Sequence, residues 1–490
     1  MIGLTGFGGY IPRLRLSRKS IADTNGWIQP GLKGLGKGER SICNWDEDSV
    51  TMAVEAARDC LHDRDNAEIR AIYLGSTTLP FLDRQNSGIV AAALNMDESL
   101  STVDITSSQK AGTTALSTAL DSADSSDGKE ILVLASDARH TRAAAQQEMI
   151  FGDGAAAFTV GSKGVIAESL ARHSFATDFV DHYRGENRSY DYNWEERWIR
   201  DEGYLKIMPQ AIDKALAKAG IDAASVDTLI APSTLKRVPE KIAQMTGINA
   251  DALADALDGR VGATGCAHPL VMLSHVLESA KPGQIIVVAS FGQGCDVLIF
   301  KVTNAIADRQ PQTGISGYIA RRQEETNYNK YMAFNDLVEQ EKGMRAELDN
   351  QTAMTQLYRR RDMLLGLVGG ECDVCGTRQF PRSRVCVNPN CNATNTQKPC
   401  NFSDTPAKIM TWSADHLTYC PDPPLHYGMI QFEGGGRFLA NFTDADVGHV
   451  GTGQDVKMMF RVKDFDNQRG FRRYFWKAAP IRTSEESKNG

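Results

Sequence analysis

The chain has 490 residues, of which 42% are hydrophobic and 23% are charged, and its formal net charge is -7 at pH 7. These values are typical of globular domains, and at about 150 residues per domain the length predicts a multidomain protein. The acidic balance favours neither a nucleic-acid partner nor a membrane partner. No apolar run approaches the about 18 residues of a membrane span, and the first residues lack the basic start and apolar core of a signal peptide, so we expect a cytoplasmic protein.

Up to about residue 305, apolar β-rich runs alternate with amphipathic helical patterns. The predicted strands are 71–76, 130–137, 155–161, 228–233, 284–292 and 297–302. The predicted helices are 49–63, 112–124, 205–220 and 269–283. Strands that helices bury on both faces are typical of α/β architecture. The runs "KEILVLASDAR" and "GDGAAAFTVG" resemble "GQIIVVASFGQG" and "DVLIFKV", which predicts two similar halves over about 1–165 and 166–305.

From residue 306 the character of the sequence changes. Residues 306–360 are rich in charge, which predicts a helical connector packed on the outside. Residues 406–490 contain short strand-like runs separated by turn residues. These runs are 408–415, 427–435, 437–444, 456–464 and 472–479. Short strands at this spacing predict a small all-β module.

Four of the ten cysteines lie close together in the intervening segment, 361–405. They are Cys372, Cys375, Cys386 and Cys391. Thiolates from two such pairs can converge on one tetrahedral zinc ion, and a closed set of four ligands leaves no open position for catalysis. We therefore predict a zinc ribbon with a structural zinc ion. The second pair is separated by four residues instead of the commoner two, so Cys400 is the reserve candidate for the place of Cys391.

The stretch "DITSSQKAGTTAL", residues 104–116, indicates the end of a strand, a sharp turn and the start of a helix. It resembles the nucleophile turn of the thiolase superfamily, in the branch of 3-hydroxy-3-methylglutaryl-CoA synthase and ketoacyl-ACP synthase III. "MIFGDGAAAFTVG" and "AKPGQIIVVASFGQG" are similar to later strand motifs of that branch, and residues 361 to about 485 resemble its zinc-ribbon plus OB-fold companion domain. The resemblance implies a duplicated αβαβα layered domain over 1–305, a zinc ribbon over 361–405 and an OB-fold barrel over 406–490.

The resemblance also implies chemistry on an acyl-CoA thioester, but the family's catalytic residues are replaced. In the family a cysteine at the nucleophile turn is acylated by the thioester, and here that position holds Gln109. The positions that match the family's glutamate, histidine and asparagine hold Thr77, Pro232 and Ala263. The usual acyl-cysteine step is therefore missing.

The first hypothesis is an enzyme that makes or breaks a carbon–carbon bond without that step. The amide of Gln109 can polarise a thioester carbonyl or a developing enolate oxygen. Glutamine at this position of ketosynthase-like domains is associated with decarboxylation, and retro-aldol cleavage of a 3-hydroxyacyl-CoA needs the same stabilisation and also a base. The fused architecture favours lyase chemistry. We predict His268 as the acid/base and Ser108 as a weaker candidate.

The second hypothesis is that the nucleophile has moved to Cys266, which stands near His268, or to Cys295. A cysteine near a histidine is the minimum for thiolate chemistry, but buried cysteines often only fill a core. The third hypothesis is a non-catalytic scaffold that binds acyl-CoA or completes another enzyme as a further subunit.

The ligand and partner expectations follow from the resemblance. Lys236 and Arg237 are candidates for binding the phosphates of CoA, and a solvated helix start is the alternative. The aromatic and charged segment 190–204 is either a cap over the active site or a surface excursion. We expect a homodimer through the thiolase-like domain and, because the β module lacks a strong basic surplus, no nucleic-acid partner.

Overall fold

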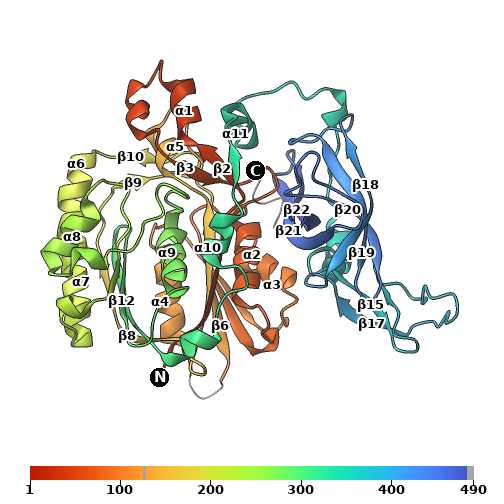
Figure 1. Ribbon diagram of the computed structural model, residues 1–490, viewed down its shortest axis with the longest axis horizontal. Helices are drawn as coiled ribbons and strands as arrows, with labels where there is room; N and C mark the ends of the chain where they lie inside the picture. The colour runs from red at the N-terminus through yellow and green to blue at the C-terminus, as the bar shows by residue number, and fades with distance from the viewer. Residues whose placement is uncertain (125–127, 483–490) are drawn as a thin grey trace. The chain divides into compact units, whose positions relative to one another are not determined.

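The structure, a computed structural model, describes residues 1–124 and 128–482, so residues 483–490 of the predicted 406–490 module lie outside it. The chain forms two compact units (Figure 1). The first consists of Met1–Asn44, Asp48–Ala91 and Met96–Leu337, and the second of Trp45–Glu47, Ala92–Asn95 and Val338–Gly490. Among the described residues, no helix combines the length and apolar character needed to cross a membrane.

The first unit is built on a sheet whose described strands follow the order β11-β12-β13-β8-β1-β7-β6-β4-β5. In chain order these are β1 (Gly3–Tyr10), β4 (Ile69–Gly75), β5 (Ser101–Ile105), β6 (Glu130–Asp137), β7 (Gly154–Gly161), β8 (Ala167–Ala176), β11 (Thr228–Ile230), β12 (Ile285–Phe291) and β13 (Gly294–Val302). β1, β6 and β7 are buried along their whole length, as expected for strands covered by helices on both faces.

The helices of this unit divide into three layers. They are α2 (Ser49–Cys60), α3 (Asn86–Ala93), α4 (Ala111–Ser122), α7 (Leu205–Ala219), α8 (Val238–Thr246), α9 (His268–Leu277) and α10 (Gly314–Ala320). α2 contacts β1, β6 and β7, and α7 contacts β8, β12 and β13. α4 and α9 contact strands of both halves, so they form the middle layer, and Figure 1 shows them between β12 and β6. The layers therefore alternate as α/β/α/β/α.

The two halves repeat one strand pattern. In the first half β1 pairs antiparallel with β7, β7 antiparallel with β6, and β6 parallel with β4. In the second half β8, β13, β12 and β11 repeat these three relationships in the same order. The duplication inferred from the repeated sequence runs is confirmed at the level of strand pairing.

The predicted strands and helices of residues 49–302 are all present, with ends that differ by a few residues. Two strands of the main sheet, β1 and β8, were not predicted from the sequence. β1 reads "GLTGFGGY", and its four glycines obscure the strand pattern. Glycine is needed there because other segments approach the strand closely. A Cβ on Gly8, for example, would lie 2.4 Å from the backbone of Cys60. β8 alternates polar and apolar residues without the continuous apolar run of its neighbours.

A smaller group of elements lies beside the main sheet in the same unit. Its sheet has the order β14-β2-β3, from β2 (Leu14–Ser17), β3 (Glu39–Ile42) and β14 (Gln323–Glu325). Three helices belong with it, α1 (Arg18–Asn25), α5 (Gln146–Ile150) and α11 (Tyr328–Phe334). Apolar side chains of these elements form a separate core cluster, which includes Leu16, Ile21 and Met149.

The second unit holds two sheets and short helices, α12 (Met354–Arg359) and α13 (Arg361–Leu364). One sheet has the order β16-β15-β17, from β15 (Val368–Cys372), β16 (Arg378–Gln379) and β17 (Gln397–Asn401). The other is antiparallel throughout, in the order β20-β19-β18-β21-β22. Its strands are β18 (Ala407–Asp415), β19 (Leu425–Phe432), β20 (Arg437–Asn441), β21 (Asp455–Asp466) and β22 (Phe471–Pro480). The predicted small all-β module is therefore present, and its description as an OB fold stays a prediction.

Candidate active site

The turn that was expected to carry a nucleophile joins the end of β5 to the start of α4. Ser107 has a φ of +72°, a left-handed conformation that a serine adopts only in a tight turn. The Ser108 hydroxyl donates to the carbonyl of Gly292 at 2.8 Å and accepts from the backbone N–H of Lys110 at 3.2 Å. A Cβ on Gly292 would lie 2.7 Å from that same nitrogen, so the β12–β13 turn can approach only as glycine. Ser108 therefore holds the turn together.

Gln109 occupies the tip of this turn and is oriented by a neighbouring hydroxyl. Its Nε2 lies 3.4 Å from the Oγ1 of Thr77. The Thr77 hydroxyl donates its own proton to Asp137 Oδ2 at 2.9 Å, so it is left to accept from the amide N–H of Gln109. This hydrogen bond fixes the orientation of the Gln109 amide, because its NH2 group must face the hydroxyl of Thr77.

Asp137, at the end of β6, is the fixed point of this arrangement. Its carboxylate is fully buried and also accepts from the backbone N–H groups of Thr77 at 2.7 Å and Cys266 at 2.8 Å. The hydroxyls of Ser76 and Thr78 donate to it at 3.1 and 3.0 Å. A buried carboxylate needs such donors in place of water, and here they tie the ends of β4 and β6 to the segment before α9.

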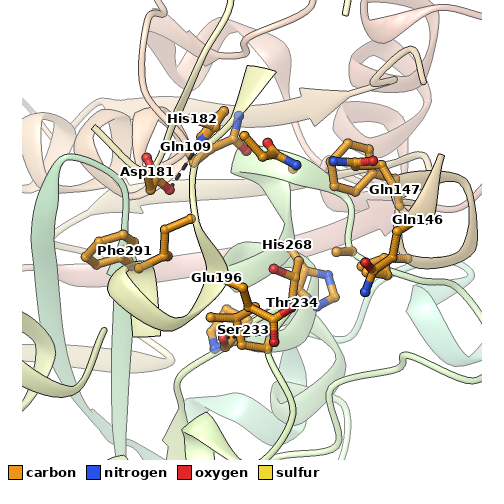
Figure 2. A pocket seen from close by; sticks show the side chains of 18 of the residues that line it. Gln109, Gln146, Gln147, Asp181, His182, Glu196, Ser233, Thr234, His268 and Phe291 are labelled. Atoms are coloured by element: carbon orange, nitrogen blue, oxygen red, sulfur yellow. Dashed lines mark hydrogen bonds and ion pairs between the residues drawn. The ribbon is translucent and has the colours of Figure 1, made fainter. Parts of the chain in front are cut away.

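A cavity of about 850 Å³ opens beside the turn (Figure 2). Its lining includes Gln109, and also Pro232 and Ala263, which occupy the positions matched to the family's histidine and asparagine. Three segments far apart in sequence thus meet at one cavity, as the resemblance implied. Ser108 is not among its lining residues.

The two cysteines considered as relocated nucleophiles lie elsewhere. Cys266 and Cys295 are both completely buried, and neither lines the cavity. Burial away from water raises the pKa of both thiols well above the ordinary value. A thiol that is buried and protonated cannot attack a thioester, so the structure gives these residues the role of core packing.

His268 lies at the start of α9 and lines the cavity, but its ring is already engaged. Its Nδ1 is 3.3 Å from the hydroxyl of Thr264, and the ring donates to the carbonyl of Ala256. The residue is only 4% exposed, and this burial lowers the pKa of His268 to about 4. At neutral pH it is an uncharged imidazole with both nitrogens occupied.

One wall of the cavity is aromatic. Tyr204 and Phe291 both line it and stack with ring centroids 4.3 Å apart. Phe179 and Trp198, which stack at 4.1 Å, lie outside the lining. Tyr204 closes a π-helical segment, Ile199–Tyr204, between α6 (Glu196–Trp198) and α7. Such π segments are frequent at functional sites because they redirect side chains from a helix. The segment 190–204 therefore contributes to the cavity, which favours the cap over the surface excursion.

The pair Asp181 and His182 also lines the cavity and was not singled out from the sequence. Nδ1 of His182 lies 3.0 Å from Oδ2 of Asp181, shown as a dashed line in Figure 2. The pair stands at the start of a hairpin of β9 (His182–Tyr183) and β10 (Tyr192–Asn193). An adjacent Asp and His in a charged loop is a weak sequence signal, because only the fold of the hairpin turns it towards the cavity.

The candidate CoA-binding residues separate in the structure. Lys236 is exposed and lines the cavity, whereas Arg237 is exposed and does not. Arg237 immediately precedes α8 and has a φ of +61°. Arg18 and Arg200 are further cations of the lining that the sequence reasoning did not assign to a ligand.

In the second unit, the four predicted cysteine ligands come together, with all four sulfur atoms within 4.8 Å of one another. Sγ of Cys372 is 3.9 Å from Sγ of Cys391, and Sγ of Cys375 is 3.6 Å from Sγ of Cys386. Zinc–sulfur bonds of about 2.3 Å in a tetrahedron require about 3.8 Å between sulfurs, so the donor set fits a zinc ion. The reserve candidate Cys400 is not part of this group.

Comparison with known proteins places these observations in context. Residues 216–300 match the family model for the C-terminal part of 3-oxoacyl-[acyl-carrier-protein] synthase III. Hydroxymethylglutaryl-CoA synthase of Methanopyrus kandleri is 30% identical over 313 residues, 63% of this chain and 89% of that protein. The same enzyme of Pyrococcus horikoshii is 29% identical over 329 residues, 66% of this chain and 92% of that protein.

Solved structures agree with these relatives in fold. An HMG-CoA synthase complexed with CoA superposes with a TM-score of 0.61 at 18% identity, covering 72% of this chain and 94% of that one. The 3-oxoacyl-[acyl-carrier-protein] synthase III of Aquifex aeolicus gives 0.52 at 20% identity, covering 61% of this chain and all of that one (100%). These likenesses confirm the duplicated, layered α/β fold that the sequence motifs implied.

Proposed function

The chain belongs to the family of hydroxymethylglutaryl-CoA synthases, and from this premise we propose that it makes or breaks a carbon–carbon bond next to the thioester of an acyl-CoA without forming an acyl-enzyme. The observation that carries the proposal is the position of Gln109. It stands at the tip of the nucleophile turn, with an amide oriented by Thr77, beside a cavity of about 850 Å³.

The chemistry follows from what an amide can do there. An amide N–H donates to an oxygen that gains negative charge, which is what the thioester oxygen does when an enolate forms next to it. One such donor contributes about 3 kcal/mol to the transition state in a water-excluded site. The side chain of Gln109 offers no nucleophile, so a covalent intermediate is absent, and cleavage of a 3-hydroxyacyl-CoA by retro-aldol chemistry is the reaction we favour. Decarboxylation of a malonyl-type thioester uses the same donor.

Two alternatives have less support. A relocated thiolate nucleophile conflicts with the burial of Cys266 and Cys295 and with the raised pKa of both thiols. A non-catalytic scaffold or accessory subunit does not need an oriented amide at the cavity, whereas the Asp137, Thr77 and Gln109 arrangement holds one. The hydrogen bonds from Gln109 to Thr77 and from Thr77 to Asp137 therefore favour a catalytic role over binding alone.

The test is product analysis with the full chain. Wild type, Gln109→Met and the exposed control Gln85→Met are incubated with 3-hydroxyacyl-CoA thioesters, 3-hydroxy-3-methylglutaryl-CoA among them, and with malonyl-CoA. We expect wild type and Gln85→Met to release a shorter acyl-CoA with no mass gain on the protein, and Gln109→Met to be about 100-fold slower. Equal turnover by Gln109→Met would remove the polariser role, and a stable protein adduct would restore an acyl-enzyme.

For CoA, we propose that Lys236 binds a phosphate at the cavity mouth with Arg237 beside it. Paired cations suit phosphate groups, and Lys236 belongs to the cavity lining. Relatives named as CoA-thioester enzymes, and a similar structure complexed with CoA, support this assignment.

For the second unit, we propose that the cysteine cluster binds a structural zinc ion. The sulfur separations match a tetrahedral site, and four protein ligands leave no position for substrate. Zinc bound there would hold β15 and the loop that carries Cys386 and Cys391 together.

For assembly, we propose a homodimer through the first unit. β5 is the last strand of the main sheet and pairs, among the described residues, only with β4. Val103 on this strand is 37% exposed. An open sheet edge with an exposed apolar side chain favours pairing with a second copy, and the mass of the protein in solution by light scattering tests this.

A further inference from the structure

A retro-aldol step needs a base, and the cavity lining includes an adjacent acid and histidine that the function proposed above does not use. This pair is Asp181 and His182. Both line the cavity, and Figure 2 shows the contact between them. The pair comes from a segment that carries none of the positions matched to the family's catalytic residues.

The carboxylate of Asp181 fixes which nitrogen of the imidazole is basic. Oδ2 of Asp181 lies 3.0 Å from Nδ1 of His182, so Nδ1 carries the proton and Nε2 keeps its lone pair when the ring is neutral. The contact found for the His182 ring among the described residues is made by Nδ1, and the side chain is 18% exposed, so Nε2 is left open to a ligand in the cavity. A partly accessible Nε2 with a free lone pair has the form of a general base.

Asp181 itself shows a feature that its fold does not explain. The residue is 8% exposed, and its Oδ1 has no hydrogen-bond partner among the described residues. Its other oxygen, Oδ2, contacts His182, and the hydroxyl of Tyr204, which hydrogen-bonds to Ser233, lies near enough to interact with the carboxylate. Buried carboxylate oxygens are normally paired, and an unpaired one beside a cavity indicates a function for the negative charge.

The hairpin that carries His182 is bonded to the residue that orients Gln109. Arg184, two residues after His182, donates to the backbone carbonyl of Thr77, the residue whose hydroxyl orients Gln109. Asp191 on the other arm accepts from Arg184 at 3.1 Å and forms an ion pair with Arg139. Thr77 therefore connects the amide of Gln109 to the segment that presents His182.

The other histidine of the cavity is a poorer base. Both ring nitrogens of His268 are engaged, one facing the Thr264 hydroxyl and one donating to the Ala256 carbonyl. The lowered pKa of His268, about 4, means that it binds a proton weakly at neutral pH. In His182, by contrast, the contact found among the described residues engages Nδ1 only.

We propose that His182 is the general acid/base of this site and that Asp181 is its positioning residue. This inference rests on the proposed function. In the cleavage direction, Nε2 of His182 takes the proton of the substrate's 3-hydroxyl, the oxygen forms a carbonyl, and the bond between C2 and C3 breaks. Its electron pair becomes the thioester enolate, whose oxygen accepts from the amide of Gln109, and His182 returns the proton to C2.

The first experiment measures the nitrogen itself and needs no turnover. The full chain is treated with diethylpyrocarbonate, with and without acetyl-CoA, and each histidine is located by peptide mass spectrometry. We expect His182 to be carbethoxylated and acetyl-CoA to protect it at least fivefold. His62 is the matched control, because it forms a similar 3.0 Å contact with its neighbour Asp63 but is 41% exposed and outside the cavity. It should react equally with and without the thioester. An unreactive or unprotected His182 overturns the proposal.

The second experiment compares His182→Gln, Asp181→Asn and the control His62→Gln in the turnover assay. General acid/base catalysis contributes about 100-fold to 10,000-fold, so His182→Gln should lose at least 100-fold in kcat, with KM changed little. Asp181→Asn should keep part of kcat and move the acid limb of the rate profile to lower pH, a shift that a merely structural residue would not cause. Full activity of His182→Gln would overturn the assignment while leaving the proposed function intact.

The two failures remain distinguishable. If wild type converts none of the thioesters, the proposed function and the catalytic role of His182 fail together. Protection of His182 by acetyl-CoA in the first experiment would then identify it as an acyl-CoA contact of a binding protein. If wild type is active and His182→Gln is equally active, the proposed function stands and the base is a residue other than His182.

Discussion

The amide nitrogen of Gln109 lies 3.4 Å from the hydroxyl oxygen of Thr77, and that hydroxyl in turn donates to the buried carboxylate of Asp137. By the resemblance, these two positions belong to the family's nucleophile and its acid/base. In this chain they have become a hydrogen-bonded pair of neutral side chains. Where the resemblance implies two reactive groups, this chain has one oriented amide donor.

Removing the Thr77 hydroxyl should therefore lower activity by more than the accompanying loss of protein stability would cause. Thr77→Val deletes the hydroxyl that orients Gln109 and one donor to Asp137, and we expect a fall in kcat of about tenfold and a loss of about 1–2 kcal/mol of stability. Thr78→Val is the matched control, because its hydroxyl donates to the same carboxylate at 3.0 Å but makes no contact with Gln109. Kinetics and thermal unfolding of both variants check this. Equal losses of activity in the two would contradict the orienting role.

Replacing Gln109 by cysteine should create a covalent acceptor. The residue lies just before α4, and the positive end of a helix dipole stabilises a thiolate. We expect Gln109→Cys to gain one acyl group on incubation with acetyl-CoA, seen as a single mass increment on the intact protein. Gln109→Ser should gain none, because a hydroxyl needs a base to become a nucleophile. An unmodified cysteine variant would mean that the cavity does not bring the thioester to the turn.

Loss of one cluster cysteine should release zinc. Cys386→Ser removes a ligand whose sulfur lies 3.6 Å from that of Cys375, and we expect the zinc content to fall from one to near zero per chain with a lower unfolding temperature of the second unit. Cys400→Ser is the control, since Cys400 lies outside the group, and should keep its zinc. Elemental analysis and calorimetry measure both. A full zinc content in Cys386→Ser would contradict the assigned ligand set.

Glu148 should make stability depend on pH. Burial away from water raises the pKa of Glu148 to about 7, against the donors Tyr328 and the Ala144 N–H, which lower it. Between the unfolded pKa of about 4.3 and about 7, the folded state keeps a proton that the unfolded state releases, so this contribution is present at low pH and lost as pH rises.

Glu148→Gln cannot titrate and should therefore gain stability over wild type as pH rises from 5 to 8, by on the order of 2 kcal/mol. The lowered pKa of His268 makes stability rise with pH between about 4 and 6.5. Wild type and variant share this effect, so it cancels when their stabilities are subtracted. Thermal unfolding across pH measures this, with exposed Glu240→Gln on α8 as a control that should show no trend. A pH-independent difference for Glu148→Gln would contradict the raised pKa.

Lys236 should affect binding of CoA rather than chemistry. Removing a cation at the cavity edge weakens attraction to a phosphate, so Lys236→Ala should raise KM for an acyl-CoA about threefold to tenfold with kcat unchanged. Lys241→Ala, at an exposed position of the adjacent α8, is the control. Higher salt should reduce the difference between wild type and Lys236→Ala, because salt screens exposed charges. A KM that does not change would favour the solvated helix start.

The sequence alone determined the features that short-range pattern controls. Alternating apolar runs identified the strands and helices of the layered domain, because burial on both faces leaves a local signature. The spacing of Cys372 and Cys375 indicated a metal knuckle, and the resemblance placed Gln109 where the family has its nucleophile. β1 was not predicted because its glycines serve close contacts with distant segments, as Gly8 does with the backbone of α2, and no local pattern reveals such contacts.

The tertiary structure decided which of these residues share a cavity. Cys266 and Cys295 were reasonable nucleophiles in sequence, yet long-range packing buries both and raises the pKa of each thiol. His268 reached the cavity but lost its free nitrogens there to neighbouring groups. Asp181 and His182 were recognised as site residues only from the structure, in which the β9–β10 hairpin brings both to the cavity lining. The type of a side chain is written in the sequence, but its solvation and partners depend on residues distant along the chain, and those decide its chemistry.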